Sequence, residues 1–170
     1  MEDEVYGVDK EHAHPNAVKL VTQEFFWDCA DDLAPFGSDE GDTGLSEFRS
    51  WRLDNPNTPI KECLNWAIED IAEITQSDYN ENILSEALIK EQIENEDFDD
   101  AYYIWTVDVT VISTGFGQLL DEGKIDLDAK PIINLALSRQ IIWAENLDSW
   151  GHREQYISNL SYLKELLNKA

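Results

Sequence analysis

Basic residues, cysteines and long apolar runs are all scarce in this 170-residue chain. Only 12 lysines and arginines face 36 aspartates and glutamates, which gives a formal net charge of −24 at pH 7. A surface of this sign repels nucleic-acid phosphates and anionic lipid headgroups, so we expect neither nucleic acid nor membrane as a partner. The charge instead favours a basic protein, a polyamine or a metal ion.

The scarcity of cysteine and of apolar runs narrows the class of protein further. Cys29 and Cys63 are too few for a disulfide framework, and both fall in patterns that predict helices, where a free thiol behaves as a small apolar side chain. No apolar run reaches the ~18 residues of a membrane span. The acidic start of the chain lacks the features of a signal peptide, so we expect a cytoplasmic location.

Apolar residues recur mainly with helical spacing, which predicts an all-α fold. We expect an acidic lead-in over residues 1–13 and a single domain over residues 14–170, built as a compact bundle of six or seven helices. The first helix should begin at Pro15, with His14 as its cap, and continue to Leu33. The remaining helices are expected around residues 45–51, 59–75, 77–88, 101–116, 128–147 and 156–167.

One segment supports two interpretations. Between residues 102 and 113, Trp105, Val107 and Val109 alternate with polar residues, as in a strand, and this would make the fold α+β. The same segment also carries an apolar stripe at helical spacing. Because a lone strand would have no partner elsewhere in the chain, we favour a buried central helix.

Asp108 stands out because it lies in the middle of that apolar run. A buried carboxylate must be paired, protonated or exposed at an edge. A raised pKa would make Asp108 a candidate general acid, whereas a hydrogen-bonded partner would make it a structural residue that orders the core. Arg139 is the candidate partner.

Two histidines and several carboxylates near the start of the domain suggest a metal site. His12, His14, Asp28 and Asp39 supply the imidazole and carboxylate ligands that Zn, Mn or Fe accept. On one continuous helix, however, the histidines would lie ~20 Å from Asp28, so a helix cap with solvated acids is the alternative. The loop at residues 38–42 lacks the spacing of an EF-hand, and we expect it to cap the helix that follows.

Three sequence motifs carry a resemblance to a known family. The motifs are His12-Ala13-His14-Pro15, Phe26-Trp27-Asp28 and Ala34-Pro35-Phe36-Gly37-Ser38-Asp39-Glu40-Gly41. Together they resemble the YfeS-type family of uncharacterised bacterial proteins. The resemblance implies a small, mainly helical cytoplasmic protein without an assigned activity. It also marks Trp27, Asp28, Phe36, Gly37, Asp39 and Gly41 as one structural or binding constellation.

These observations favour a non-catalytic interaction protein that binds a basic protein partner, as an immunity protein or inhibitor does. Its acidic face would be built from residues 28–42 and 91–100. The candidate binding residues are Trp27, Asp28, Phe36, Gly37, Asp39, Glu40 and Asp108. Two alternatives stay open: a divalent-metal protein or metal-dependent hydrolase, and a small-molecule pocket lined by tryptophans. We expect no other cofactor, and the sequence leaves the oligomeric state open.

Overall fold

The computed structural model describes residues 8–72, 74–94, 98–147 and 150–170, and all regular elements in these ranges are helical. The all-α prediction is therefore confirmed. The α-helices are α1 (Pro15–Leu20), α2 (Asp39–Asp54), α3 (Ile60–Ala72), α4 (Glu86–Glu94), α5 (Phe98–Glu122), α6 (Lys130–Glu145) and α7 (Arg153–Lys169). Short 3-10 turns are η1 (Glu24–Trp27), η2 (Gln76–Asp78), η3 (Glu81–Leu84) and η4 (Leu127–Ala129). None of the helices in the described ranges combines the length and apolarity that a bilayer span requires.

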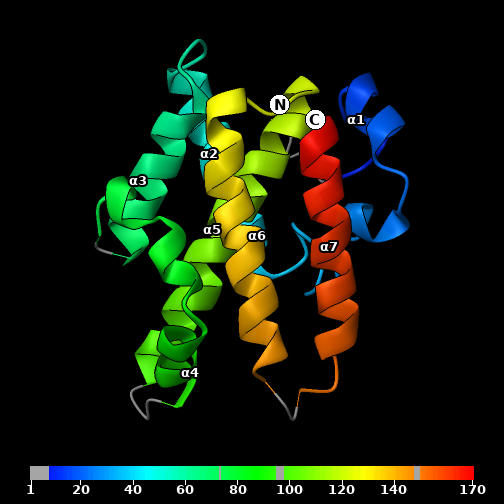
Figure 1. Cartoon of the computed structure of the whole chain (residues 1–170). Helices are drawn as coiled ribbons and strands as arrows, with labels where there is room; N and C mark the ends of the chain where they lie inside the picture. The colour runs from blue at the N-terminus through cyan, green and yellow to red at the C-terminus, as the bar shows by residue number, and fades with distance from the viewer. Residues whose placement is uncertain (1–7, 73, 95–97, 148–149) are drawn as a thin grey trace.

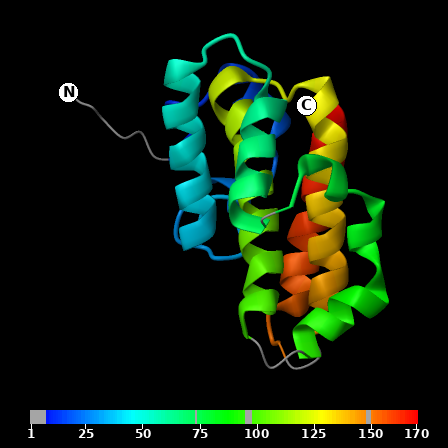
Figure 2. The same ribbon diagram turned by 90° about the vertical axis from the view of Figure 1, so that its left-hand side faces the viewer.

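The bundle has three layers, with α5 in the middle. Helices α2 and α3 pack on one side of α5, and α6 packs on the other side with α7 against it. Figure 1 shows α6 and α7 upright and side by side, and Figure 2 shows α5 running between the α2–α3 side and the α6–α7 side. Helix α5 therefore forms the centre of the hydrophobic core.

The central position of α5 explains why residues 102–113 resemble a strand in the sequence. Every residue from Val107 to Leu120 is buried, so apolar side chains are needed on all faces of the helix and the usual amphipathic stripe is weak. The buried hydroxyl of Thr110 donates to the carbonyl of Thr106 at 2.7 Å, and that of Ser113 donates to the carbonyl of Thr110 at 3.2 Å. These local bonds let polar residues stay inside a buried helix.

Glycine allows the layers to approach closely. A side chain at Gly115 of α5 would collide with Ile133 of α6. Gly123 ends α5 with a φ of +80°, a conformation that L side chains rarely adopt.

The predicted first helix is wrong beyond its first turns. His14 caps α1 as expected, because its Nδ1 accepts from the amide of Asn16 at 3.0 Å, but α1 ends at Leu20. The chain then extends through Val21, and the amide of Thr22 donates to the Tyr162 hydroxyl of α7 at 2.8 Å. A tertiary contact and two β-branched residues thus override the helical spacing that continued to Leu33.

Other boundaries also differ from the expectation. Helix α2 is longer than the segment 45–51 and begins at Asp39, while residues 77–88 form two 3-10 turns and the start of α4. Both cysteines are free; Cys63 is buried in α3 as predicted, whereas Cys29 is exposed outside any helix. Burial raises the pKa of the Cys63 thiol to about 12, so at neutral pH it is an inert apolar group.

Candidate functional site

The acidic segment, residues 28–42, connects η1 to the first turn of α2. It lies inside a stretch between Lys19 and Arg49 that has no lysine or arginine. The exposed carboxylates of the segment are those of Asp28, Asp32, Asp39 and Asp42. They form the candidate contact surface for a positively charged partner.

The backbone of the acidic segment is held by short-range hydrogen bonds. The carboxylate of Asp28 accepts from the amide of Ala30, and that of Asp31 accepts from the amide of Leu33, each at 2.9 Å. Such contacts are typical of turns that an aspartate stabilises. The side chain of Asn159 in α7 donates to the carbonyl of Leu33 at 3.1 Å. The loop is thus fixed both locally and to the bundle.

The end of the acidic segment is the start of α2, as the capping prediction required. The hydroxyl of Ser38 accepts from the amide of Gly41 at 3.0 Å. Asp39, Glu40 and Asp42 lie in the first helical turn, where carboxylates interact favourably with the helix dipole. The Glu40 carboxylate also accepts from the indole of Trp105 at 2.9 Å, which ties α2 to α5.

The aromatic members of the predicted constellation have different environments. Phe36 is buried and packs edge-on against Phe26, with ring centroids 5.4 Å apart, so it supports the core rather than offering a contact surface. Trp27 is partly exposed, and the Lys10 ammonium lies 6.0 Å from its ring centroid. Gly37 approaches Asp31 so closely that a side chain would collide with its backbone. Of the predicted binding residues, Asp28 and Asp39 present exposed carboxylates.

Asp108 belongs to a buried polar cluster, the Asp108 network, and its predicted partner, Arg139, is confirmed. Arg139 binds it with two hydrogen bonds of 2.8 Å, from Nε to Oδ2 and from Nη2 to Oδ1. The Tyr79 hydroxyl donates to Oδ1 at 2.6 Å, and Gln140 donates to Oδ2 at 3.1 Å. Gln140 in turn accepts from the Tyr156 hydroxyl at 2.5 Å. Asp108 is 0% exposed, so it cannot contact a partner protein.

Electrostatics in the Asp108 network favour fixed protonation states. Burial, reinforced by the nearby carboxylate of Asp108, raises the pKa of Tyr79 and of Tyr156 well above its usual value. Burial lowers the pKa of Arg139, but the adjacent Asp108 outweighs this effect and raises it. The tyrosines are thus neutral donors and Arg139 is a cation at physiological pH. The geometry fits a structural role for Asp108.

The residues proposed as metal ligands have separate local contacts. The ring of His12 lies 2.9 Å from the carboxylate of Asp9, and His14 uses Nδ1 to cap α1. Asp28 stabilises its own turn, and Asp39 lies in the first turn of α2. In the part of the chain that the structure describes, no group of three or more histidine, cysteine or acidic side chains is arranged to hold a metal ion.

A tryptophan-rich cluster lies where α5, α6 and α7 meet. The rings of Trp105 and Trp143 are 5.7 Å apart, those of Trp143 and Trp150 are 6.1 Å apart, and Tyr156 lies 5.5 Å from Trp150. The cavity that Trp105 and Tyr156 help to line has a volume of about 10 Å³. This is room for one water molecule at most, so Trp105 and Tyr156, with ring centroids 5.7 Å apart, pack against each other there rather than around a metabolite.

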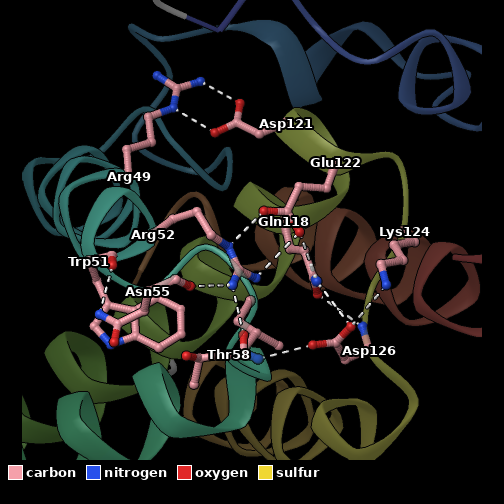
Figure 3. Close-up of polar contacts among 11 residues, drawn as sticks. Arg49, Trp51, Arg52, Asn55, Thr58, Gln118, Asp121, Glu122, Lys124 and Asp126 are labelled. Carbon is pink, nitrogen blue, oxygen red and sulfur yellow. Dashed lines mark hydrogen bonds and ion pairs between the residues drawn. The ribbon is translucent and has the colours of Figure 1, made fainter.

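Sequence reasoning missed a second polar cluster, the α5-end network, which lies beside an open depression of about 550 Å³. Figure 3 shows its members, Arg52, Asn55, Thr58, Gln118, Glu122, Lys124 and Asp126. Arg52 donates to Glu122 at 2.7 Å and to the carbonyls of Asn55 and Thr58 at 2.9 and 2.7 Å. Asp126 accepts from the amide of Ile60 at 2.9 Å and thereby caps α3.

The α5-end network joins two loops to the end of the central helix. Gln118 donates to Glu122 and to Asp126, each at 3.1 Å, and accepts from the amide of Asp126 at 2.9 Å. These polar groups already bind one another, so the network is suited to holding the loops in place. Motifs gave no signal for it, because Arg52 and Glu122 are 70 residues apart.

The sequence of this chain is similar to that of a curated bacterial protein. The chain is 25% identical over 150 residues to the uncharacterised protein YfeS of Escherichia coli (strain K12), an alignment that covers 88% of this chain and 59% of that protein. The chain therefore spans about three fifths of the length of this curated relative. No family model and no solved structure matches it. The resemblance predicted from the sequence motifs is confirmed, and it brings no activity with it.

Proposed function

We propose that this protein binds a cationic protein partner through the acidic segment, in the manner of an immunity protein or inhibitor in the cytoplasm. The observation that carries the proposal is the run of carboxylates between Lys19 and Arg49 without any lysine or arginine, four of them exposed on the acidic segment. Opposite charges across an interface raise the rate of association and select against partners of the wrong sign.

The way in which the acidic segment is held supports the same proposal. Its turns are closed by Asp28 and Asp31, its end is capped by Ser38, and Asn159 ties it to α7. A contact surface that is already ordered loses little conformational entropy on binding. The carboxylates can therefore be presented to a partner without a prior rearrangement of the loop.

The other part of the predicted acidic face is the stretch 91–100. Residues 95–97, within the stretch 91–100, lie outside the described residues. Glu91 and Glu94 at the end of α4 are exposed. The proposal therefore rests on residues 28–42.

Affinity capture from the native lysate with a charge-matched control tests this function. Replacing Asp28, Asp32, Asp39 and Asp42 by asparagine removes four charges. Asp28→Asn keeps a side-chain oxygen that can accept the hydrogen bond from the amide of Ala30. The control removes four exposed charges elsewhere, by Asp54→Asn, Glu145→Gln, Glu154→Gln and Glu165→Gln.

We expect basic proteins, identified by mass spectrometry, to be captured at low salt by the wild type and by the control but not by the acidic-segment variant. Raising the salt to about 0.5 M should release them, because screening shortens the range of charge interactions. Equal capture by both variants would rule out the acidic segment as the contact surface. Failure of the wild type to enrich any basic protein would overturn the function itself.

A further inference from the structure

The outer face of α3 carries Trp66, the most exposed of the six tryptophans, all of which lie within the described residues. Trp66 is 46% exposed, whereas the other five are partly or largely covered. Helix α3 uses its opposite face, with Cys63, Leu64, Ala67 and Ile68 buried, to pack on α5. Figure 2 shows α3 in front of the bundle with no other helix over it. Trp66 is therefore exposed because it lies on the side of α3 that faces away from the bundle.

Carboxylates surround Trp66 on this face. Glu62, Glu69 and Asp70 lie four residues before, three after and four after it, and all three are exposed. Side chains at these spacings are neighbours on a helix surface, with about 5–6 Å between Cβ atoms. No lysine or arginine occurs between Lys61 and Lys90. The patch, which we call the Trp66 patch, thus combines one aromatic face with three negative charges.

We propose that the Trp66 patch binds an arginine side chain of a cationic protein partner. A guanidinium stacks on the face of an indole and can at the same time donate to carboxylates at its edge. Tryptophan and arginine are also the residues most often found as energetic centres of protein interfaces. A second copy of this chain is a poor occupant, because two molecules of charge −24 repel each other.

This site is separate from the acidic segment, and it shares with the proposed function only the sign of the partner's charge. The acidic segment offers carboxylates at the start of α2, whereas the Trp66 patch lies on α3 and adds an aromatic surface. The two sites can therefore be tested one at a time. A partner that lacks arginine would use the first and not the second.

The test is isothermal titration of the full chain with a peptide of three Arg-Gly-Ser repeats at low salt, and with its Lys-Gly-Ser counterpart. The variants are Trp66→Leu, the triple change Glu62→Gln, Glu69→Gln and Asp70→Asn, and the matched control Glu145→Gln, Glu154→Gln and Glu165→Gln. Circular dichroism melts establish that each variant is folded, which is expected because every changed side chain is exposed.

We expect Trp66→Leu to weaken binding of the arginine peptide about fivefold, as the loss of a cation–π contact of order 1 kcal/mol implies. The triple change on α3 should weaken binding of the arginine peptide more than the matched control does. The lysine peptide should bind to the wild type less tightly than the arginine peptide does. Equal affinity of wild type and Trp66→Leu for the arginine peptide would overturn the Trp66 patch. The proposed function would survive that result if basic proteins were still captured through the acidic segment.

Discussion

The Asp108 network and the α5-end network are built from the same chemistry but in different surroundings. In both, an arginine binds a carboxylate of α5 through its guanidinium. The side chains of Arg139 and Asp108 are 9% and 0% exposed, whereas those of Arg52 and Glu122 are 17% and 29% exposed. The difference separates a charge pair that fixes the core from one that fixes loops at its edge.

The two networks also connect different parts of the fold. The Asp108 network joins α5 to α6, to α7 through Tyr156, and to the chain between η2 and η3 through Tyr79. The α5-end network joins α5 to the loops that precede α3 and η4. A buried charge without its partner is far more costly than a partly hydrated one, so the two networks should respond very differently to mutation.

The largest expected effect comes from Asp108→Leu. This change leaves the Arg139 guanidinium charged in the core and removes the acceptor of Tyr79 and Gln140. We expect a loss of about 3–5 kcal/mol in the free energy of unfolding, the usual cost of breaking a buried ion pair. Urea denaturation followed by circular dichroism measures it.

A double variant, Asp108→Leu with Arg139→Met, sharpens this result. Because it removes both charges, it should be more stable than Asp108→Leu alone. If the double variant were as unstable as the single one, lost packing and unpaired hydroxyls, rather than an uncompensated charge, would explain the effect.

The next effect, at the α5-end network, is that of Arg52→Ala. The change removes hydrogen bonds to Glu122 and to two loop carbonyls, and the packing of the guanidinium over Trp51 at 5.1 Å. We expect a loss of about 2 kcal/mol, in the range of hydrogen bonds to charged groups. Arg52→Lys keeps the charge without the planar fork, so it should restore only part of the stability. Full restoration would mean that charge alone matters here.

The central ion pair of the Asp108 network could be predicted from the sequence, whereas the α5-end network could not. Asp108 was recognisable because a carboxylate inside an apolar run needs a partner, and Arg139 is a cation within the next predicted helix. The helical state of residues 102–113 followed from the lack of a second strand. Both inferences depend on burial, which the hydropathy pattern records.

The parts that were missed depend on tertiary contacts between partly exposed groups. Arg52 and Glu122 lie 70 residues apart on hydrophilic positions, and only the packing of α2 on α5 brings them together. The predicted continuation of the first helix failed for a similar reason: Thr22 binds Tyr162, and Phe26 rather than Phe25 enters the core. The carboxylates of the acidic segment were visible in the sequence, but their exposure was not.

A smaller, pH-dependent effect is expected at Asp126. Burial raises its pKa, but hydrogen bonds from the Ile60 amide and Gln118, together with nearby Lys124, outweigh burial and hold the pKa below the usual value of an aspartate carboxyl. A carboxylate with a depressed pKa in the folded state stabilises the fold above its unfolded pKa, and this contribution disappears as the pH falls through the folded value.

Unfolding of wild type and Asp126→Asn across pH 6 to 2 measures this contribution. The difference in free energy of unfolding between the two proteins should be largest near pH 6 and should disappear below about pH 4. Gln118→Met removes one of the hydrogen bonds to Asp126. In that background the stability difference should disappear at a higher pH. A stability difference between wild type and Asp126→Asn that stayed constant with pH would show that the substitution destabilises the fold for steric rather than electrostatic reasons.

The smallest effect is expected at Arg49–Asp121, which is more exposed than the arginine pairs of the two networks. Arg49 of α2 binds Asp121 of α5 through two hydrogen bonds of 2.9 Å, but the side chains are 28% and 30% exposed. Water screens such a pair, so Arg49→Ala should cost at most about 1 kcal/mol despite its bidentate geometry. The cost should shrink further in 0.5 M NaCl, while that of Asp108→Leu should not. A loss at Arg49 as large as that at Arg52 would mean that exposure does not rank these pairs, and that the number of helices and loops each arginine joins must be considered instead.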